Sequence, residues 1–385
     1  MRIGVNAWRL RGQRTGVGRY LHNVLRHWTD EALAGRADRV TAYTPVPLGA
    51  ETPLPPTIRE RVVRPDWPML AWENLRLAPA ANEDVLLCPS YTRPLAARAR
   101  TVVTTHDVTL HTHPELYPRR ARLAYDRLYG WSARHATLVM TASEAVRGDV
   151  ARSYRVPESR IRVVPLAADD SFRPLPGDPC VDAARMEYLG GPEPFFLFVG
   201  KLSQRRNIPL LLEAFAELRS RRSVEHKLLV IGLNTHGLDV AGLAARLGIA
   251  DAVVHREYVA DDDLVALYNA AETLVLPATV ENLSLPAMEA QAVGTPVIAI
   301  DTPGMRDTTG GAAWLMARAE RRELVEAMAS LASEPRRREE LAEAGLAEAA
   351  KRSWRRCSLE TLAVLEEAAE LAPPALAAQA HGVRS

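Results

Sequence analysis

The chain has 385 residues, of which 47% are apolar and 25% are charged, and its 48 Lys and Arg residues nearly balance 47 Asp and Glu residues. This composition is typical of a soluble globular protein, and the length predicts two domains. No apolar run approaches the roughly 18 residues of a membrane-spanning helix, which excludes an integral membrane protein of that kind.

The three cysteines, Cys88, Cys180 and Cys357, are far apart and form no C-x-x-C motif. This pattern excludes a disulfide framework and a cysteine-ligated metal site, and it favours a reducing compartment. The N-terminus enters a strand directly and has no long apolar segment, so we expect no signal peptide. The sequence therefore predicts a cytoplasmic protein.

Charge is distributed unevenly along the chain. Residues 1–168 contain 25 Arg and no Lys against 15 Asp and Glu, a formal charge of +10, whereas the remainder has a formal charge of −9. A basic half next to an acidic half indicates that one of them meets an anionic partner. We therefore expect peripheral contact with an anionic membrane surface, at the inner face of the plasma membrane, and no nucleic acid.

The first half of the chain alternates strands and helices. This alternation predicts a parallel, doubly wound α/β sheet within a domain spanning residues 1–168. The predicted elements are a strand at 2–7, a helix at 16–28, strands at 40–43, 84–88 and 101–105, a helix at 119–136, a strand at 137–141, a helix at 143–154 and a strand at 161–165.

Residues 169–194 are rich in proline and glycine and are predicted to be an inter-domain linker. The alternation then restarts and predicts a second Rossmann-like domain at 195–353. Its predicted strands are 195–199, 227–231, 251–255, 273–276 and 296–300, and its predicted helices are 208–219, 238–247, 262–271, 285–293, 320–332 and 336–351. A further helix is predicted at 354–371, followed by a flexible tail at 372–385.

The loop at residues 200–207 follows the strand FFLFV and precedes a helix. It reads Gly-Lys-Leu-Ser-Gln-Arg-Arg-Asn, and Lys201 is one of only three lysines in the chain. A helix N-terminus offers free amides to an anion, and Lys201 and Arg206 add full charges. The loop is a candidate phosphate site, and a solvated basic loop is the alternative interpretation.

Two glutamates, Glu281 and Glu289, lie eight positions apart where a buried strand gives way to a helix. Ligands of open α/β sheets bind beyond the carboxyl ends of the strands, and a carboxylate accepts hydrogen bonds from adjacent hydroxyls. The pair thus suits a ligand rich in hydroxyls. In the alternative interpretation Glu281 caps the helix and Glu289 is a surface residue.

Two features of the first half are also candidates. Glycines in the segment 12–19 let backbone amides approach a phosphate, although the G-x-G-x-x-G spacing is incomplete. His106 ends a strand, where it can bond a substrate hydroxyl, or else it pairs with its neighbour Asp107. The segment 119–134 mixes arginine with Leu, Tyr and Trp and either contacts anionic lipid or packs as an ordinary amphipathic helix. The sequence contains no metal, serine-hydrolase or Walker motif.

Taken together these segments resemble glycosyltransferase family 4, a family of retaining GT-B enzymes that use nucleotide sugars. The resemblance covers nearly the whole chain. Residues 277–299 resemble the E-x7-E segment of the family and residues 200–215 its diphosphate-binding loop, while residues 105–118 and 141–169 resemble segments of its acceptor domain. The fold implied is GT-B, in which two Rossmann-like α/β domains face each other across a cleft, and the helix at 354–371 crosses back to the first domain.

The resemblance also implies roles for individual residues. Glu289 holds the ribose hydroxyls, Glu281 the hydroxyls of the donor sugar, and Lys201 and Arg206 clamp the diphosphate. Gly16 and Gly18 close over the diphosphate from the other domain, and His106 contacts the transferred sugar. The set of catalytic residues is therefore His106, Glu281, Lys201 and Arg206. The donor-binding set is Gly16, Gly18, Lys201, Arg205, Arg206, Tyr258, Asn282, Leu283, Ser284, Leu285 and Glu289.

The chain departs from the family pattern at three places, one of which is a proline-glutamate pair after the last strand of the second domain that appears here as Arg306 and Asp307. The family commonly has Gly-Phe-Gly after the first glutamate, where this chain has Asn282, Leu283 and Ser284. The basic pair is usually Arg then Lys, and here Lys201 and Arg206 reverse the order, which moves the bidentate guanidinium to the second position. Asn282 offers a side-chain amide in place of the missing glycine contacts.

The function implied is transfer of a sugar from a nucleotide sugar, with GDP-mannose favoured over UDP-sugars, to a lipid-linked or saccharide acceptor in cell-surface polysaccharide assembly. No cofactor or metal is expected beyond this co-substrate. One alternative is a glycosyltransferase that acts on a small natural product with a UDP- or dTDP-sugar. Others are an NAD-dependent oxidoreductase, a glycoside hydrolase that uses the two glutamates, and a sugar-binding module without activity.

Overall fold

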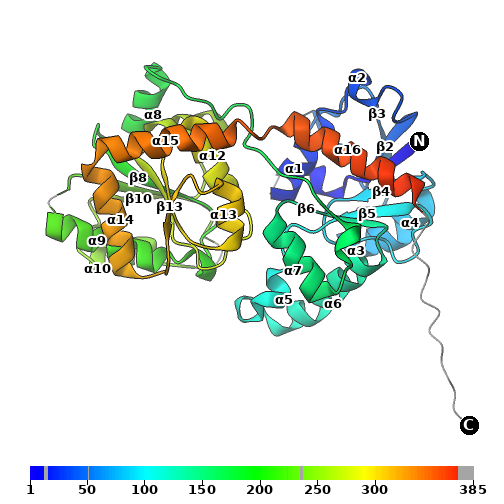
Figure 1. The fold of residues 1–385 in the computed structure, drawn as a ribbon, viewed down its shortest axis with the longest axis horizontal. Helices are drawn as coiled ribbons and strands as arrows, with labels where there is room; N and C mark the ends of the chain where they lie inside the picture. The colour runs from blue at the N-terminus through cyan, green and yellow to red at the C-terminus, as the bar shows by residue number, and fades with distance from the viewer. Residues whose placement is uncertain (13–15, 51, 223, 235–236, 372–385) are drawn as a thin grey trace, which may run out of the picture. The chain divides into compact units, whose positions relative to one another are not determined.

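The computed structural model describes residues 1–12, 16–50, 52–222, 224–234 and 237–371, and the chain divides into two compact units (Figure 1). Unit 1 comprises residues 1–165 together with the chain from Trp354 onward, and unit 2 comprises residues 166–353. The predicted tail at 372–385 lies outside the described residues. Each unit contains one parallel sheet with helices. Two α/β domains of this kind in one chain are the GT-B fold.

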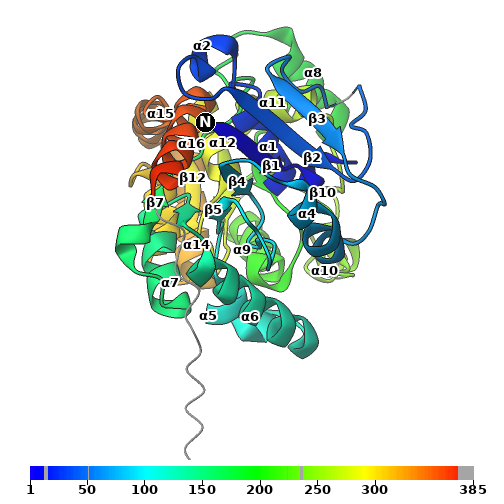
Figure 2. The same ribbon diagram turned by 90° about the vertical axis from the view of Figure 1, so that its right-hand side faces the viewer.

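Unit 1 is built on a seven-stranded sheet with the order β3-β2-β1-β4-β5-β6-β7, in which every neighbouring pair is parallel. Figure 2 shows β1, β2 and β3 side by side at one edge. The strand order reverses between β1 and β4, which makes this the topological switch point of the sheet. The strands are β1 (Arg2–Asn6), β2 (Arg39–Thr44), β3 (Ile58–Val62), β4 (Val85–Cys88), β5 (Arg100–Thr104), β6 (Leu138–Thr141) and β7 (Ile161–Val163).

Helices cover the sheet of unit 1, and the C-terminal helix α16 (Trp354–Glu370) is one of them. Its Ser358 hydroxyl donates to the carbonyl of Val24 at 2.8 Å, and the Trp28 indole donates to the carbonyl of Ser358 at 3.4 Å. The last helix of the chain therefore completes the core of the first unit. The other helical segments of unit 1 are η1 (Trp8–Leu10), α1 (Gly16–Leu25), α2 (Asp30–Leu33), α3 (Met69–Trp72), η2 (Glu73–Leu77), α4 (Ala78–Ala80), α5 (Thr109–Thr112), η3 (Pro114–Leu116), α6 (Arg119–His135), α7 (Glu144–Tyr154) and η4 (Glu158–Arg160).

Unit 2 repeats the same topology in a six-stranded parallel sheet, β10-β9-β8-β11-β12-β13. Its switch point lies between β8 and β11. The strands are β8 (Phe195–Val199), β9 (Lys227–Ile231), β10 (Val253–Arg256), β11 (Thr273–Leu276), β12 (Val297–Ile300) and β13 (Trp314–Met316). The helical segments are α8 (Pro179–Leu189), η5 (Gln204–Arg206), α9 (Ile208–Arg222), α10 (Val240–Arg246), α11 (Asp261–Ala270), α12 (Leu285–Val293), α13 (Pro303–Thr309), α14 (Arg321–Ser333) and α15 (Pro335–Ala349).

The segment 169–194, expected to be a linker, belongs structurally to unit 2. It contains α8, and its side chains Phe172, Ala184 and Leu189 are buried in the core of that unit. Proline and glycine there begin and end a helix, because Pro179 occupies the first turn after the cap Asp178 and Gly190 closes the helix in the left-handed conformation. The expected boundary at 168 likewise lies at residue 165.

Several short elements were not predicted. β3 carries mostly exposed charged residues and forms the edge of its sheet, so it lacks the apolar pattern of a buried strand. β13 has three residues and α13 has seven, which is too short for a periodic signal. No helix in the described ranges is long and apolar enough to cross a membrane.

Candidate active site

The switch point of unit 2 brings together the two loops that the sequence singled out. β8 and β11 pair in parallel, so the loop at residues 200–207 and the loop at residues 277–284 leave the same edge of the sheet at neighbouring positions. The Thr279 amide donates to the carbonyl of Arg205 at 3.0 Å and joins the two loops directly. Ligands of open α/β sheets bind at this place.

A buried ion pair forms the centre of this site. The Glu281 carboxylate, 5% exposed, binds the guanidinium of Arg206, whose side chain is 11% exposed, and also Arg205 at 3.4 Å. Arg205 Nη1 donates in addition to the carbonyl of Val280 at 2.9 Å. Burial lowers the pKa of Arg206 and the charge of Glu281 opposes that effect. Because each partner satisfies the other, the pair fixes the geometry of both loops.

The second glutamate lies on α12 and is also buried, with 3% of its surface exposed. The hydroxyl of Tyr268, on α11, donates to Glu289 Oε2 at 2.9 Å. Glu281 thus precedes α12 and pairs with Arg206, while Glu289 lies within α12 and accepts from Tyr268. Sequence reasoning missed Tyr268, because a tyrosine among apolar residues of a helix has the pattern of a core aromatic.

The interpretation that Glu281 caps α12 and Glu289 is a surface residue is wrong. Ser284 is the N-cap, since its hydroxyl accepts the amide of Ala287 at 3.3 Å, and Leu285 and Pro286 form the first turn. Both glutamates are almost fully buried.

The loop 281–284 has no glycine, and the glycine that allows its conformation lies on α13. A Cβ at Gly304 would stand 2.5 Å from the Asn282 Cα and from the carbonyl oxygens of Glu281 and Asn282. The cap residue of α13, Thr302, donates from its hydroxyl to the Glu281 carbonyl at 3.0 Å. Helix α13 therefore supports the loop through backbone contact, which the sequence did not indicate. Leu283 is half-buried in the same loop.

Other predicted residues of unit 2 are less closely engaged. Lys201 is exposed and makes no ion pair with any residue in the described ranges. Tyr258 follows β10 and is 66% exposed. The structure shows no contact of either side chain with the buried pair.

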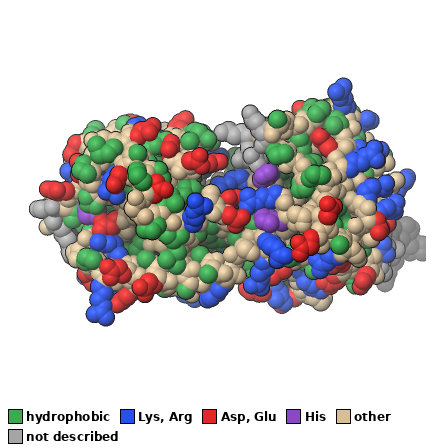
Figure 3. Space-filling view, turned by 90° about the horizontal axis from the view of Figure 1, so that it is seen from above, with side chains coloured by type: hydrophobic (Ala, Val, Ile, Leu, Met, Phe, Trp, Pro, Cys, Tyr) green, Lys and Arg blue, Asp and Glu red, His purple; other side chains and the backbone are tan. Residues whose placement is uncertain are grey.

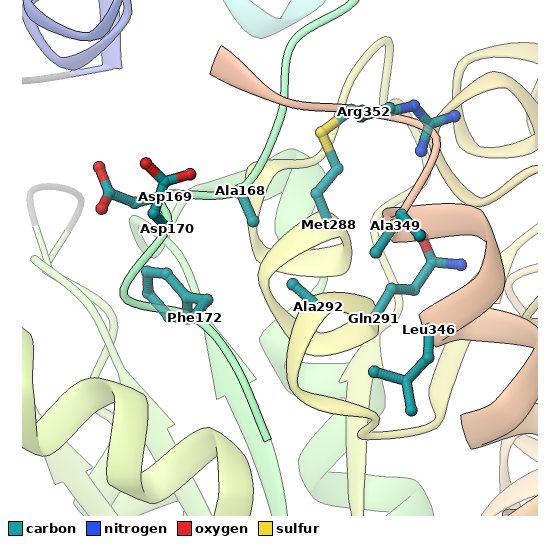
Figure 4. Close-up of a pocket in the computed structure, with 11 residues that line it drawn as sticks. Ala168, Asp169, Asp170, Phe172, Met288, Gln291, Ala292, Leu346, Ala349 and Arg352 are labelled. Carbon is teal, nitrogen blue, oxygen red and sulfur yellow. The ribbon is translucent and has the colours of Figure 1, made fainter. Parts of the chain in front are cut away.

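The far side of α12 borders a separate cavity of about 290 Å³ (Figure 4). Met288, Gln291 and Ala292 line it from α12, and Leu346 and Ala349 line it from α15. The two glutamates and the loop 200–207 do not take part in it. This cavity is therefore distinct from the site at the switch point.

In unit 1, His106 follows β5 and is held by a hydrogen bond between its Nε2 and the carbonyl of Pro89 at 2.9 Å. A carbonyl only accepts, so Nε2 carries the proton. Burial lowers the pKa of His106, with the Pro89 bond and the charge of Asp107 opposing, so the ring is neutral at pH 7. Its Nδ1 is then an acceptor suited to a substrate hydroxyl.

The predicted phosphate loop 12–19 is only partly described. Residues 13–15 lie outside the described residues, and Gly16 and Gly18 form the first turn of α1. Gly18 is buried, whereas a side chain at Gly16 would meet nothing within 4 Å.

A further group of residues at the carboxyl edge of unit 1 escaped sequence reasoning. Arg9 Nε donates to Ser90 Oγ at 3.1 Å, and Tyr91 donates to Asp107 at 3.0 Å. The Tyr91 ring stacks on Tyr129 at 4.8 Å and meets His106 edge-on at 5.5 Å. Arg9, Ser90, Tyr91 and Asp107 follow the ends of β1, β4 and β5, so position was their sequence signal, and Tyr129 lies on α6.

The chain matches two family models, which together span most of its length. The model described as Glycosyl transferases group 1 matches residues 186–347, and that described as Glycosyltransferase Family 4 matches residues 14–172. The second domain of the chain thus matches one model and the first domain the other.

Two curated proteins and one solved structure illustrate the similarity. The chain is 29% identical to O-antigen chain mannosyltransferase B of Escherichia coli, over 68% of its own length and 69% of that protein. It is 31% identical to MMP alpha-(1->4)-mannosyltransferase of Mycolicibacterium hassiacum over 61% of its length, but spans only 55% of that relative. HepE of Anabaena, solved with UDP and glucose, superposes with a TM-score of 0.74 at 17% identity, covering 96% of this chain and 99% of that one.

Proposed function

The chain belongs to glycosyltransferase family 4, with a group 1 glycosyltransferase domain in its second unit, and on this premise we propose that it transfers mannose from GDP-mannose to a lipid-linked or saccharide acceptor in cell-surface polysaccharide assembly. The observation that carries the proposal is the buried pair of Glu281 with Arg206 at the switch point of unit 2. Mannose as the sugar is supported by the names of the two curated relatives.

The chemistry follows from the charges in this site. Breaking the glycosidic bond of a nucleotide sugar leaves a diphosphate anion, and preorganised cations stabilise that charge. Glu281 accepts from Nη1 of Arg206, and an arginine has five N–H donors, so the same guanidinium has further donors for a phosphate. Exposed Lys201 adds a second cation on the same loop.

The carboxylates serve the hydroxyl groups of the donor. We assign Glu289, oriented by Tyr268, to the ribose and Glu281 to the sugar, because carboxylates accept strongly from hydroxyl donors. We further propose that the reaction retains anomeric configuration and needs no metal ion. The anomeric proton of the product by NMR, and activity in the presence of a chelator, test these two points.

A screen of nucleotide sugars by thermal stabilisation tests the donor. GDP-mannose is expected to raise the melting temperature of the wild type, and Lys201→Ala and Glu281→Ala are expected to lose that shift. Arg322→Ala is a suitable control, because Arg322 is 87% exposed on α14. Stabilisation by UDP- or dTDP-sugars alone would contradict GDP-mannose as the donor and favour the natural-product alternative. The absence of stabilisation by any nucleotide sugar would contradict the proposal as a whole.

We also propose that unit 1 contacts an anionic membrane surface through α6. Figure 3 shows the face seen from above Figure 1, where Lys and Arg are frequent over unit 1 and Asp and Glu over unit 2; α6 lies at the lower side of unit 1 in Figure 1, away from that face. Arg119, Arg120, Arg122 and Arg127 of α6 make no ion pair with any described residue, and Leu123 and Tyr125 beside them are 55% and 41% exposed. Elsewhere arginines on helices pair with glutamates four positions away, as in α14, α15 and α16.

Co-sedimentation with liposomes tests this contact. Binding is expected for vesicles rich in anionic lipid at low salt, and charge reversal of Arg119 and Arg120 to Glu is expected to weaken it. Charge reversal of Arg322 and Arg336, which lie on unit 2, is the control. Equal binding to neutral and anionic vesicles would contradict the proposal.

A further inference from the structure

A buried glutamate also bridges the switch point of unit 1. Glu73 is fully buried, and its carboxylate accepts from Thr92 Oγ1 at 2.7 Å and from Asn6 Nδ2 at 3.4 Å. Asn6 ends β1, and Thr92 lies in the loop that follows β4, so the two donors come from the two sides of the switch point. Neither the sequence motifs nor the proposed chemistry assigns Glu73 a role.

The position of this carboxylate is energetically unfavourable. Burial raises the pKa of Glu73 to about 7, although the bonds from Thr92 and Asn6 and the charge of Arg93 oppose the effect. Arg93 affects Glu73 through its charge and not through a hydrogen bond. Its guanidinium binds the carbonyl of His135 and lies 5.6 Å from the Trp131 ring. The Cys88 thiol is a further titratable group nearby, and its pKa is raised by burial and by the charge of Glu73. Glu73 also opens the π-helix η2, a type of helix that is frequent at functional sites.

The residues that Glu73 bridges hold the carboxyl edge of the unit together. Within the loop 89–93, the carbonyl of Pro89 fixes His106, and the hydroxyl of Ser90 fixes Arg9. Tyr91 adopts a left-handed conformation with φ of 64°, which is strained for a tyrosine, and its amide donates to the Thr104 carbonyl at 3.0 Å. The loop thus sets the positions of a histidine, an arginine and an aromatic ring at the ligand edge.

We propose that Glu73 is a positioning residue for the acceptor: its ionised carboxylate holds the loop 89–93 against the end of β1 and so orients His106, Tyr91 and Arg9 toward a saccharide. This inference rests on the proposed glycosyl transfer. Ring stacking on tyrosine and a guanidinium hydrogen bond are both suited to a sugar acceptor.

Ionisation matters because the observed bonds need two acceptor oxygens. An ionised carboxylate accepts from both Asn6 and Thr92, as the structure shows. A protonated Glu73 has to donate its own proton, which it can give to Thr92 Oγ1. The Thr92 hydroxyl then has the Ser90 carbonyl, 3.4 Å away, as its acceptor. Protonation of Glu73 therefore reverses the direction of its hydrogen bond with Thr92 and leaves the Thr92 hydroxyl to donate to Ser90.

Steady-state kinetics of Glu73→Gln test the proposal. We expect kcat/KM for the acceptor to fall by about 10- to 100-fold, the scale of a misplacement near 1 Å. The wild type is expected to lose activity as pH falls through about 7, and the variant is expected to lack this limb, since glutamine does not titrate. Loss of activity through protonation of His106 comes at lower pH, because the pKa of His106 is lowered.

Glu83→Gln is the matched control. Glu83 is a buried carboxylate of the same unit that accepts from the Tyr43 hydroxyl at 2.8 Å, but it precedes β4 and contacts no residue of the loop 89–93. It is expected to leave acceptor kinetics and the pH limb unchanged. The proposal would be overturned if Glu73→Gln had the acceptor kinetics of the wild type and still lost activity as pH falls through about 7.

A second pair of variants covers the case in which Glu73→Gln fails to fold. Thr92→Val removes the hydroxyl and is expected to reproduce the kinetic loss, whereas Thr92→Ser keeps it and is expected to restore acceptor kinetics. Equal kinetics of the two would overturn the proposal.

NMR provides a readout that does not depend on activity. The amide signals of Tyr91 and Thr92 are expected to titrate near pH 7 in the wild type and in Glu83→Gln, but not in Glu73→Gln. If the protein neither binds nor turns over any nucleotide sugar, the proposed function is wrong. The NMR titration then still shows whether Glu73 controls the loop 89–93. Transfer by the wild type without the titration overturns only the role of Glu73.

Discussion

At the scale of single residues, each unit places a buried glutamate across its switch point. In unit 2 an arginine binds Glu281 directly, whereas in unit 1 Glu73 accepts from a hydroxyl and an amide, and Arg93 acts on it through charge alone. A carboxylate bonded to neutral groups bears most of its desolvation penalty, and proteins retain such groups mainly at functional sites. The difference predicts that the two glutamates respond differently to pH.

Glu73→Gln is expected to change how stability depends on pH. The pKa of Glu73 is about 7 in the folded chain and about 4.5 in the unfolded one, so the folded state holds the proton between these values. The free energy of unfolding gains the full contribution of this proton below pH 4.5 and loses it as pH rises to 7. The loss is about 3 kcal/mol, at 1.36 kcal/mol per pH unit.

Urea unfolding at a series of pH values between 4.5 and 8 measures this effect. The free energy of unfolding of Glu73→Gln should fall less over this range than that of the wild type. An identical slope in the two proteins would show that Glu73 does not bind a proton on folding.

Tyr268→Phe is expected to weaken donor binding. The change leaves a buried oxygen of Glu289 without its hydroxyl donor, which destabilises the site by about 1–3 kcal/mol. Calorimetric titration with the donor measures the effect. Tyr188→Phe is the control, because it removes a similar bond, from Tyr188 to Asp263 at 2.8 Å, outside the site. An equal dissociation constant for Tyr268→Phe and the wild type would contradict the role given to Glu289.

At the scale of elements, α13 decides how a loop without glycine can lie at the donor site. The backbone of the loop 281–284 packs directly on Gly304, and Thr302 and Thr308 both bond to that loop. Gly304 on the supporting helix lets the backbone of the loop and that of α13 approach closely, because glycine has no Cβ.

Gly304→Ala is therefore expected to displace the loop. The new methyl group would stand 2.5 Å from backbone atoms, which cannot rotate away, and overpacking of this kind destabilises by about 1–3 kcal/mol. Thermal unfolding and donor affinity are both expected to decrease. In the control Gly148→Ala, the new methyl meets only the end of the Arg152 side chain, which can move. Equal donor affinity in Gly304→Ala and the wild type would show that the loop tolerates the shift.

At the scale of the whole molecule, the two units differ in how they obtain their cores. Unit 2 is continuous in sequence, whereas unit 1 depends on α16, which returns from the other end of the chain. Trp354, Cys357, Leu362 and Leu365 of α16 are at most 2% exposed. Burying such side chains contributes on the order of 5–10 kcal/mol, comparable to the net stability of a domain.

Expression of the separate segments tests this dependence. Residues 166–353 are expected to fold alone and to bind the nucleotide, and residues 1–165 are expected to remain unfolded until a peptide of residues 354–371 is added. Circular dichroism and NMR dispersion measure both outcomes. A folded 1–165 segment without the peptide would show that α16 is dispensable.

The sequence by itself determined the two parallel sheets, nearly all long helices and the loops that carry the candidate residues. These features depend on periodicity, on strand-end position and on cap residues, which are local properties of the chain. The family resemblance also implied that Glu281 and Arg206 bind the same donor, and the pairing of β8 with β11 explains why their loops share an edge.

Only the tertiary structure revealed Tyr268, Gly304 and Glu73. Each acts through a residue far away in the sequence: Tyr268 on Glu289, Gly304 on Asn282, and Glu73 on Asn6. Their local patterns are those of a core tyrosine, a helix-start glycine and a charged helical residue. The assignment of α8 to unit 2 was decided in the same way, because burial of Phe172 and Leu189 depends on packing against strands and helices that follow them in the chain.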